Sequence, residues 1–237
     1  MSLHRITLDL SPPPAGQSLI ITGDEAWHAV MVKRLQAGDT VELLDGRGIV
    51  ATAKVTSTDK HKRDAQITLN VQSVSAHPPT SPRVEVWSAV PKADRASQMI
   101  DQLAQAGAAV WRPLIAERSV TDADHKAERL HRIATEASKQ CGRPWHLALD
   151  TPRTIADAAA WAAAHPPGSI FVADADGQPA ADFTSQHLVV LVGPEGGFTP
   201  AELASLGEAG VKPLRLGPHI LRTETAAIAA AVALLAR

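Results

Sequence analysis

The chain has 237 residues, a formal net charge of −2, 45% apolar residues and 3% aromatic residues. This length suits one large domain or two modest ones, and the near-neutral charge gives no global attraction to nucleic acid or to an anionic membrane. The single cysteine, Cys141, excludes an intramolecular disulfide and a cysteine-rich metal site. Its helical context favours a buried or half-buried structural thiol.

Two features of the chain favour a soluble cytoplasmic protein. The N-terminus begins no signal-peptide pattern. The longest apolar run, Ala226–Ala236, has 11 residues and is too short to span a bilayer. We therefore expect no membrane partner.

The first 76 residues are rich in short candidate strands. Strands are expected over 5–10, 18–22, 40–44, 49–57 and 65–75, and Asp45-Gly46-Arg47-Gly48 predicts a hairpin turn. One helix is expected from Asp24 to Leu35, ending near Gly38. Five short strands with one helix favour a small β-barrel domain over residues 1–76.

A proline-rich stretch follows at residues 78–82, so we expect a linker over 77–83 and a second domain over 84–237. Strand and helix then alternate, which is typical of an α/β fold with a mainly parallel sheet. Strands are expected over 84–90, 110–115, 146–149, 169–173, 188–192 and 211–216, and helices over 93–106, 124–141 and 155–164 and from Pro200 and Thr223. The last helix is apolar nearly all round and must be buried, for which a partner subunit is a good candidate.

A glycine-rich turn, Gly193-Pro194-Glu195-Gly196-Gly197, follows the buried strand 188–192. The next helix begins with Thr199 as N-cap, Pro200 as its first residue and Glu202 to complete a capping box. Loops at the carboxyl ends of strands are where open α/β sheets hold ligands. By itself, the stretch also fits a purely structural strand–turn–helix.

A second unusual loop covers residues 216–225, between the last strand and the last helix. Neither loop has the phosphate-loop or dinucleotide-binding pattern, and the chain has no His-Glu-x-x-His metal motif and no Gly-x-Ser-x-Gly elbow. The loops offer backbone donors and acceptors, the carboxylates of Glu195 and Glu224, and the cation of Arg222. That set suits an uncharged or zwitterionic nucleoside ligand and no metal.

The two loops together carry a family resemblance. Val-Gly-Pro-Glu-Gly-Gly-Phe-Thr-x-x-Glu at 192–202, followed by Leu-Gly-x-x-Ile-Leu-Arg-Thr-Glu-Thr-Ala at 216–226, resembles the SPOUT-class RNA methyltransferases, especially those that methylate N3 of a uridine in 16S ribosomal RNA. The resemblance extends over His28–Leu35, Pro91–Arg95, Glu117–Ser119 and Glu136–Arg143.

The resemblance implies an N-terminal PUA-like domain and a C-terminal sheet that threads a trefoil knot around S-adenosylmethionine. It also implies a homodimer that would cover the last helix. The cofactor-binding residues that it implies are Leu191, Gly193, Pro194, Glu195, Gly196, Leu216, Gly217, Ile220, Leu221 and Thr225.

Uridine N3 carries a proton that must be lost before it can attack a methyl group. Arg222 is the expected stabiliser of the developing anion, because a guanidinium does not act as a base at ordinary pH. Glu195 or Glu224 could be the general base. Both glutamates could instead orient Arg222 and cap the last helix.

RNA binding must be local in a slightly acidic protein. Basic residues that could contact phosphates are Arg5, Lys33, Arg34, Lys92, Arg95, Arg118 and Arg143. Because N3 lies on the pairing edge of the base, the target must be single-stranded or flipped. The two alternatives are a related enzyme with another RNA target and a non-catalytic RNA-binding factor in ribosome assembly.

Overall fold

The computed structural model describes residues 3–61, 64–92, 94–120, 127–179 and 183–236. The chain divides into two compact units, Met1–Pro79 with Ser138–His146, and Thr80–Ala137 with Leu147–Arg237. Among the described residues, no helix has both the length and the apolar character needed to cross a membrane. The assignment of separate roles to residues 1–76 and 84–237 stays a prediction.

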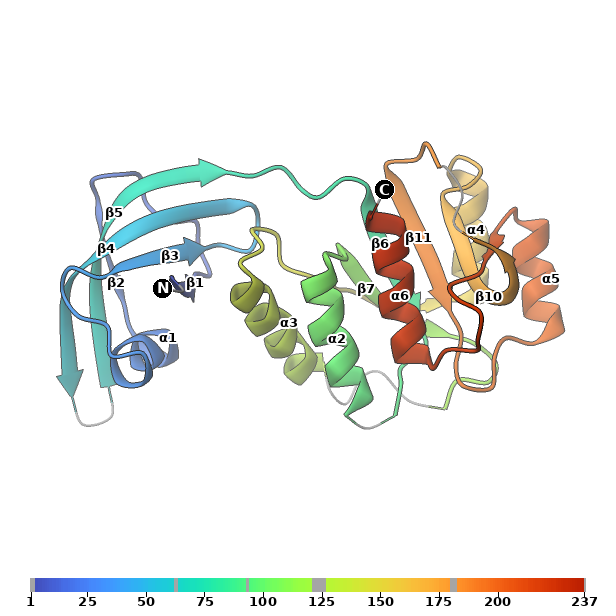
Figure 1. Cartoon of the computed structure of the whole chain (residues 1–237), viewed down its shortest axis with the longest axis horizontal. Helices are drawn as coiled ribbons and strands as arrows, with labels where there is room; N and C mark the ends of the chain where they lie inside the picture. The colour runs from blue at the N-terminus through green and yellow to red at the C-terminus, as the bar shows by residue number, and fades with distance from the viewer. Residues whose placement is uncertain (1–2, 62–63, 93, 121–126, 180–182, 237) are drawn as a thin grey trace. The chain divides into compact units, whose positions relative to one another are not determined.

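The N-terminal unit contains a five-stranded mixed sheet in the order β1-β3-β4-β5-β2 (Figure 1). β1 runs parallel to β3, and the other pairs are antiparallel. Ile6, Leu43, Ile67 and Leu69 are fully buried in its core. The strands are β1 (His4–Thr7), β2 (Ser18–Ile21), β3 (Thr40–Leu44), β4 (Ile49–His61) and β5 (Asp64–Ala76).

All five expected strands are present, but β4 and β5 are longer than predicted. Each has 13 residues, because the antiparallel ladder between them continues outward to the pair His61 and Asp64. The added residues include Asp59 and Lys60, which have low strand propensity, so the pairing with the neighbouring strand decides their conformation.

The segment expected to form one helix over 24–35 is an α-helix only at its start. The α-helix α1 (Gly23–Trp27) passes into a π-helical turn, η1 (His28–Val32). The N–H of Lys33 donates to the carbonyl of His28, five residues back, at 3.0 Å. Arg34 then takes a φ of +56°, which ends the helix before the predicted residue.

The predicted turn at Asp45 is stabilised by the aspartate itself. Asp45 is 7% exposed. Its Oδ1 accepts the N–H groups of Arg47 (2.8 Å) and Ile49 (2.9 Å), and its Oδ2 accepts the hydroxyl of Ser11 (2.9 Å). Burial alone raises the pKa of this carboxyl, but the hydrogen bonds outweigh burial and hold the pKa below its usual value of 3.8.

We expect Asp45→Ala to lower the free energy of unfolding at pH 7 by about 1.5–3 kcal/mol, as hydrogen bonds to a charged group are lost. A lowered folded-state pKa stabilises the protein above pH 3.8, and this contribution disappears as pH falls through the folded-state pKa. The free energies of unfolding of wild type and variant, measured with urea, should therefore become equal in acid. A difference that stays constant down to the lowest pH that permits folding would contradict this role, and Glu208→Ala on the exposed side of its helix is the control.

The C-terminal unit is built on a parallel sheet in the order β12-β10-β11-β6-β7-β8, with β9 paired to β7. All strand pairs of this sheet among the described residues are parallel, which confirms the predicted α/β class. The short β9 was not predicted, since two residues carry no periodic pattern. The strands are β6 (Arg83–Ser88), β7 (Val110–Ile115), β8 (Ala148–Leu149), β9 (Arg153–Thr154), β10 (Ile170–Gln178), β11 (His187–Val192) and β12 (Lys212–Leu214).

Helices cover both faces of this sheet (Figure 1). Alternate residues of β11 face opposite sides, so Val190 packs with α2 and α6 while Leu191 packs with α4 and α5. Expected helix residues at Ala93 and over 124–126 lie outside the described residues. The helices are α2 (Arg95–Ala106), α3 (Ala127–Cys141), α4 (Ile155–Ala164), α5 (Pro200–Glu208) and α6 (Thr223–Leu235).

Two sequence expectations need correction. The chain itself covers one face of α6, through contacts with α2, β6 and β11, so a partner is not needed to bury Ala227, Ala230 and Leu234. Cys141 is exposed rather than buried or half-buried, because it is the last residue of α3, and its thiol donates to the carbonyl of Ser138. The trefoil knot implied by the resemblance stays a prediction.

Candidate functional site

The carboxyl ends of three neighbouring parallel strands bring the two unusual loops together. In the sheet, β10 lies between β11 and β12, so the residues that follow β11 and β12 meet those at the bend of β10. A cavity of about 390 Å³ lies there, and a second of about 120 Å³ shares part of its lining. Both lie within the C-terminal unit. The shared lining residues are Ala173, Asp174, Ala175, Ile220, Leu221 and Ala226.

The glycine-rich turn forms one wall of the larger cavity. Gly193, Pro194 and Glu195 line it. A Cβ on Gly193 would lie 3.0 Å from the ring of Phe198, so this position is sterically restricted to glycine unless the ring moves. Gly197 has a φ of +68° and donates its N–H to the carbonyl of Pro194 at 2.8 Å, which closes the turn.

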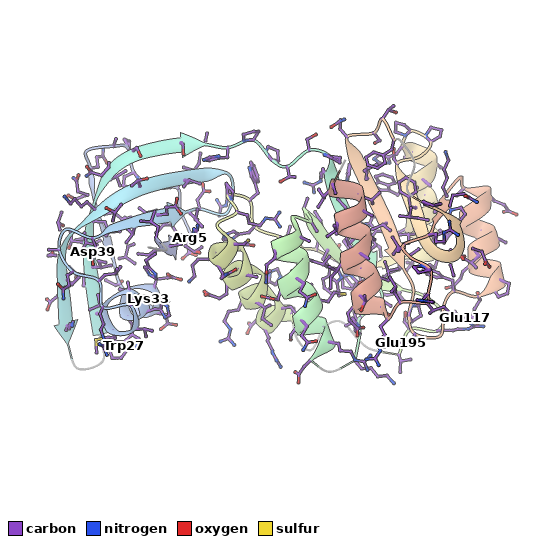
Figure 2. The ribbon with its side chains drawn as sticks, in the orientation of Figure 1. Arg5, Trp27, Lys33, Asp39, Glu117 and Glu195 are labelled. Atoms are coloured by element: carbon purple, nitrogen blue, oxygen red, sulfur yellow. The ribbon has the colours of Figure 1, made fainter. Side chains whose placement is uncertain are left out.

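The helix after the turn begins as predicted. Thr199 caps α5, and the reciprocal hydrogen bonds between Thr199 and Glu202 form a capping box with Pro200 at the helix start. The second carboxylate oxygen of Glu202 accepts the N–H of Glu117 at 2.8 Å, from the loop after β7. Burial raises the pKa of Glu202, but these hydrogen bonds outweigh it and lower the pKa overall. The turn is thus held at the same sheet edge as the β7 loop, where Figure 2 labels Glu117 and Glu195.

A buried hydrogen bond joins the two loops. Thr223, the first residue of α6, is 4% exposed, and its hydroxyl donates to the carbonyl of Gly193 at 3.1 Å. Thr223 also lines the cavity. The bond therefore fixes the start of α6 to the glycine-rich turn.

We expect Thr223→Val to lower the free energy of unfolding by about 1–3 kcal/mol, because the shape is kept while the carbonyl of Gly193 loses its donor. Ligand affinity at the cavity should fall with it. Thr223→Ser, which keeps a hydroxyl, should retain most of both. Thermal unfolding and calorimetry measure the two effects, and a valine variant as stable as wild type would show that the bond does not hold the loops.

The opposite wall is the loop of residues 216–221. In the part of the chain that the structure describes, no backbone hydrogen bond involves residues 216–221. Ile220 on this loop is 91% exposed, and Leu216, Gly217, Ile220 and Leu221 line the cavities. The loop is half-buried to exposed, so its donors, acceptors and apolar side chains are available to a flat polar ligand.

Charged side chains gather at the rim of the cavity. Arg222 lines it, is exposed, and has no ion-pair partner among the described residues. Nη1 of Arg95, on α2, lies 3.8 Å from Oε1 of Glu195 and 3.9 Å from Oε1 of Glu224. The other oxygen of Glu224, Oε2, is buried without a hydrogen-bond partner. The guanidinium of Arg95 therefore lies within ion-pair distance of both carboxylates.

The structure brings most of the predicted site residues together, but four lie off the cavity wall. Leu191 is fully buried on the α4 and α5 side of the sheet, because strand side chains alternate. The carbonyl of Gly196 accepts Nη1 of Arg118 at 2.7 Å, outside the cavity. Thr225 is exposed, and Glu224 faces Arg95. The roles of all these residues stay predictions.

The sequence prediction does not include ten lining residues: Ala173, Asp174 and Ala175 of β10, together with Val192, Gly197, Phe198, Leu203, His219, Thr223 and Ala226. Oδ1 of Asp174 accepts the N–H of Asp176 at 2.8 Å, and the half-buried carboxylate lies at the cavity. The signal was available, since an aspartate directly follows the predicted strand 169–173. The same strand-end rule that selected the glycine-rich turn applies to it.

The predicted RNA-contacting residues occupy different environments. Arg5 pairs with Glu42 at 2.8 Å and donates to the carbonyl of Gln140 at 2.9 Å. Arg143 is half-buried, and burial lowers the pKa of its guanidinium. Both side chains are half-buried, so they are less accessible to a phosphate group than an exposed arginine. Lys33 (Figure 2), Arg34, Lys92 and Arg118 are exposed, and Arg95 faces the cavity rim.

Two family models match the chain. An RNA methyltransferase domain covers residues 78–235, and an RNA methyltransferase PUA domain covers residues 21–68. These matches confirm the PUA-like class expected of the N-terminal sheet and the class of the C-terminal sheet.

Curated relatives and solved structures agree with the family models. The chain is 32% identical to ribosomal RNA small subunit methyltransferase E of Mycobacterium bovis, over 92% of this chain and 86% of the relative. It is 30% identical to the Bacillus subtilis protein of that name, over 87% and 85%. A Legionella pneumophila structure described as a methyltransferase with bound SAM has a TM-score of 0.83 at 27% identity, covering 100% and 98% of the two chains.

Proposed function

The chain belongs to the RNA methyltransferase family of these relatives, and on that premise we propose that it transfers a methyl group from S-adenosylmethionine to N3 of a uridine in 16S ribosomal RNA. The name of its relatives, small subunit methyltransferase, supports the choice of 16S RNA. The motif resemblance at 192–202 and 216–226 supports uridine N3. The cytoplasmic location expected from the sequence is part of the same proposal.

The observation that carries the proposal is the exposed loop 216–221 beside the cavity, which makes no backbone hydrogen bond to other described residues. A cavity of about 390 Å³ falls within the usual range for ligand sites. The backbone groups of residues 216–221 and the apolar Leu216, Ile220 and Leu221 fit an adenine ring, which needs hydrogen bonds at its edge and apolar contact at its faces. The relative from Legionella pneumophila binds SAM.

The two walls of the cavity would contact different parts of the cofactor. Leu216, Gly217, Ile220 and Leu221 would hold the adenine, and Gly193, Pro194 and Glu195 would line the other side. Asp174 adds an acceptor to the same cavity. When bound, S-adenosylmethionine supplies a methyl group on a positively charged sulfur, so the protein's main contribution is alignment.

The charged rim supplies the proton chemistry. Uridine N3 becomes nucleophilic when its proton passes to a base, which leaves the electron pair of the broken N–H bond on N3. Arg222 has no partner among the described residues and can stabilise the anion on the base. Glu195 and Glu224 are the candidate acceptors of the proton, with Arg95 placed between them.

The RNA itself is held by local positive charge. Exposed Lys33, Arg34, Lys92 and Arg118 are available to phosphates. The target uridine must be unpaired when it enters the cavity, because the pairing edge carries the reacting atom.

Two measurements test the proposal in order. Calorimetry with S-adenosylmethionine should show binding to the purified chain. Incubation with tritium-labelled cofactor and small ribosomal subunits from a strain lacking the gene should then place the label in 3-methyluridine. No cofactor binding at millimolar concentration would support a non-catalytic RNA-binding factor, and label in another nucleoside or another RNA would assign a different target.

The outer face of α6 supports a homodimer. Val232 is 47% exposed, Thr225 is exposed, and Ile228 and Ala229 are half-buried, so this face carries no charge to favour solvent. A second copy would cover it, as closed two-fold assemblies commonly do. Light scattering should give twice the 25.0 kDa mass of the chain, and Val232→Glu should shift the mass toward the monomer.

A further inference from the structure

The N-terminal unit has a groove between the two edge strands of its sheet. A cavity of about 630 Å³ lies there. One side is formed by Thr7–Ser11, at and after the end of β1, and the other by Ser18–Thr22 of β2 and the residues after it. β1 and β2 are the outermost strands in the sheet order, and among the described residues each has a hydrogen-bonded neighbouring strand on one side only.

The free edge of β2 presents unpaired backbone groups to the outside of the sheet. The N–H of Val71 donates to the carbonyl of Gln17 at 2.9 Å. Two residues further along β2, Leu19 lies opposite Leu69 of β5, so Leu19 also directs its N–H and C=O toward β5. In an antiparallel pair the intervening residues point their N–H and C=O groups the other way. Those of Ser18 and Ile20 therefore face the open edge, where an extended peptide can add as a strand.

The side chains of the groove are acidic and apolar. Asp9, Asp24 and Glu25 line it, and none of the lining residues is Lys, Arg or His. Leu10 is 77% exposed and Ile20 is 59% exposed. This composition repels RNA phosphates and attracts a cationic segment that also carries apolar side chains.

Polar atoms of the groove walls also lack partners. Oγ1 of Thr7 and Oε2 of Glu25 are buried without a hydrogen bond in the described structure. The other oxygen of Glu25 accepts Nζ of Lys139 at 2.7 Å, so one of the three carboxylates is already paired within the unit. Asp9 and Asp24 are exposed and have no ion pair among the described residues.

We propose that this groove binds an extended basic segment of a partner protein, added as a strand along the free edge of β2. Lysine or arginine side chains of the segment face Asp9 and Asp24, and an apolar side chain between them packs on Leu10 and Ile20. The groove lies within the N-terminal unit, and the sign of its charge is opposite to what RNA phosphate requires.

The probe is a fluorescein-labelled octapeptide of alternating lysine and valine, titrated against the full chain by fluorescence anisotropy. Binding should weaken at least about tenfold when glutamate replaces lysine, since the charge match is lost. It should weaken by a similar factor when proline replaces alternate residues, since proline donates no backbone hydrogen bond. Equal binding of the lysine and glutamate peptides, or no binding of the lysine peptide at millimolar concentration, would overturn the proposal.

Two variants locate the peptide on the protein. Ile20→Pro removes an N–H from the free edge but none from the ladder with β5, and the double variant Asp9→Asn with Asp24→Asn removes the facing charge. Each should weaken peptide binding by about fivefold or more. The double variant Glu128→Gln with Glu208→Gln, which changes the net charge equally at exposed sites elsewhere, should change it by less than about twofold.

Circular dichroism checks that each variant is folded, and if Ile20→Pro does not fold, the aspartate double variant and the proline peptide decide. Equal weakening by the Glu128 and Glu208 control would contradict the groove as the site. Displacement of the bound peptide by oligouridine would place it on the RNA surface instead. A dimer that dissociates on adding the peptide would identify a second copy of the chain as the natural occupant. Either of these last outcomes would also overturn the proposal.

Discussion

Arg222→Ala is expected to lower kcat for RNA methylation by about 10²–10³-fold, the usual effect of removing a group that stabilises developing negative charge. Arg222 lines the cavity, is exposed, and has no ion-pair partner among the described residues. Its charge is therefore available to the substrate. The Kd for S-adenosylmethionine should stay within about threefold, because the interaction is made with the base and not with the cofactor.

Arg215→Ala is the matched control for this variant. Arg215 is exposed and lies on the same connection between β12 and α6, but it does not line either cavity at the site. Its loss should leave kcat within about twofold of wild type. Single-turnover assays with saturating cofactor separate chemistry from binding. An Arg222 variant with wild-type turnover would remove Arg222 from the active site and leave the role of anion stabiliser to Arg95.

Gly177→Ala is expected to lower both the stability of the C-terminal unit and the affinity for S-adenosylmethionine. Gly177 is a buried residue of β10, and a Cβ there would lie 2.8 Å from the backbone nitrogen of Leu214 and 2.9 Å from that of Arg215. These are backbone atoms of β12 and the loop after it, so no side chain can rotate to make room. The free energy of unfolding should fall by about 1–3 kcal/mol, as in other overpacked sites.

The same substitution should weaken S-adenosylmethionine binding. The N–H of Arg215 donates to the carbonyl of Gln178 at 2.8 Å, and this bond holds the start of the loop that supplies Leu216–Leu221 to the cavity. Displacing β12 moves that wall. We therefore expect a rise of about tenfold or more in the Kd, measured by calorimetry at a temperature where the variant is folded.

Gly207→Ala provides a control of opposite sign. Gly207 lies in α5 with no heavy atom within 4 Å of the added Cβ, so alanine should raise the unfolding free energy by about 0.5–1 kcal/mol. Thermal unfolding of the two glycine variants gives the comparison. A Gly177 variant with the Tm of wild type would show that β10 and β12 can separate without cost.

Local sequence determined those features whose causes are local. Thr199, Pro200 and Glu202 define the start of α5, because capping bonds join residues three positions apart. The apolar run before Gly193 defines β11, since a parallel strand buried on both faces needs no polar alternation. The alternation of strands and helices after residue 83 determined the α/β class in the same way. Together with the two loop motifs, these features predicted the family and the position of the ligand site.

Tertiary contacts decided what depends on neighbours distant in sequence. Asp174 lines the cavity because β10 lies between β11 and β12 in the sheet. This strand order cannot be predicted from the local sequence of any of the three strands. Charge alone assigns Arg95 to RNA, but the fold places it near Glu195 and Glu224, which lie 100 and 129 residues later in the chain. Leu191 had been assigned to the cofactor, yet its strand register points it into the opposite core.

The length of β4 and β5 and the open edge of β2 have the same origin. A strand is stabilised by the hydrogen bonds of its partner, so Asp59 and Lys60 become extended because the facing chain is. The sequence by itself determined most of the helices and strands, the glycine-rich turn and the family. The tertiary structure decided which side chains share a cavity and which edges stay unpaired, because those facts depend on packing between segments that the chain order does not place together.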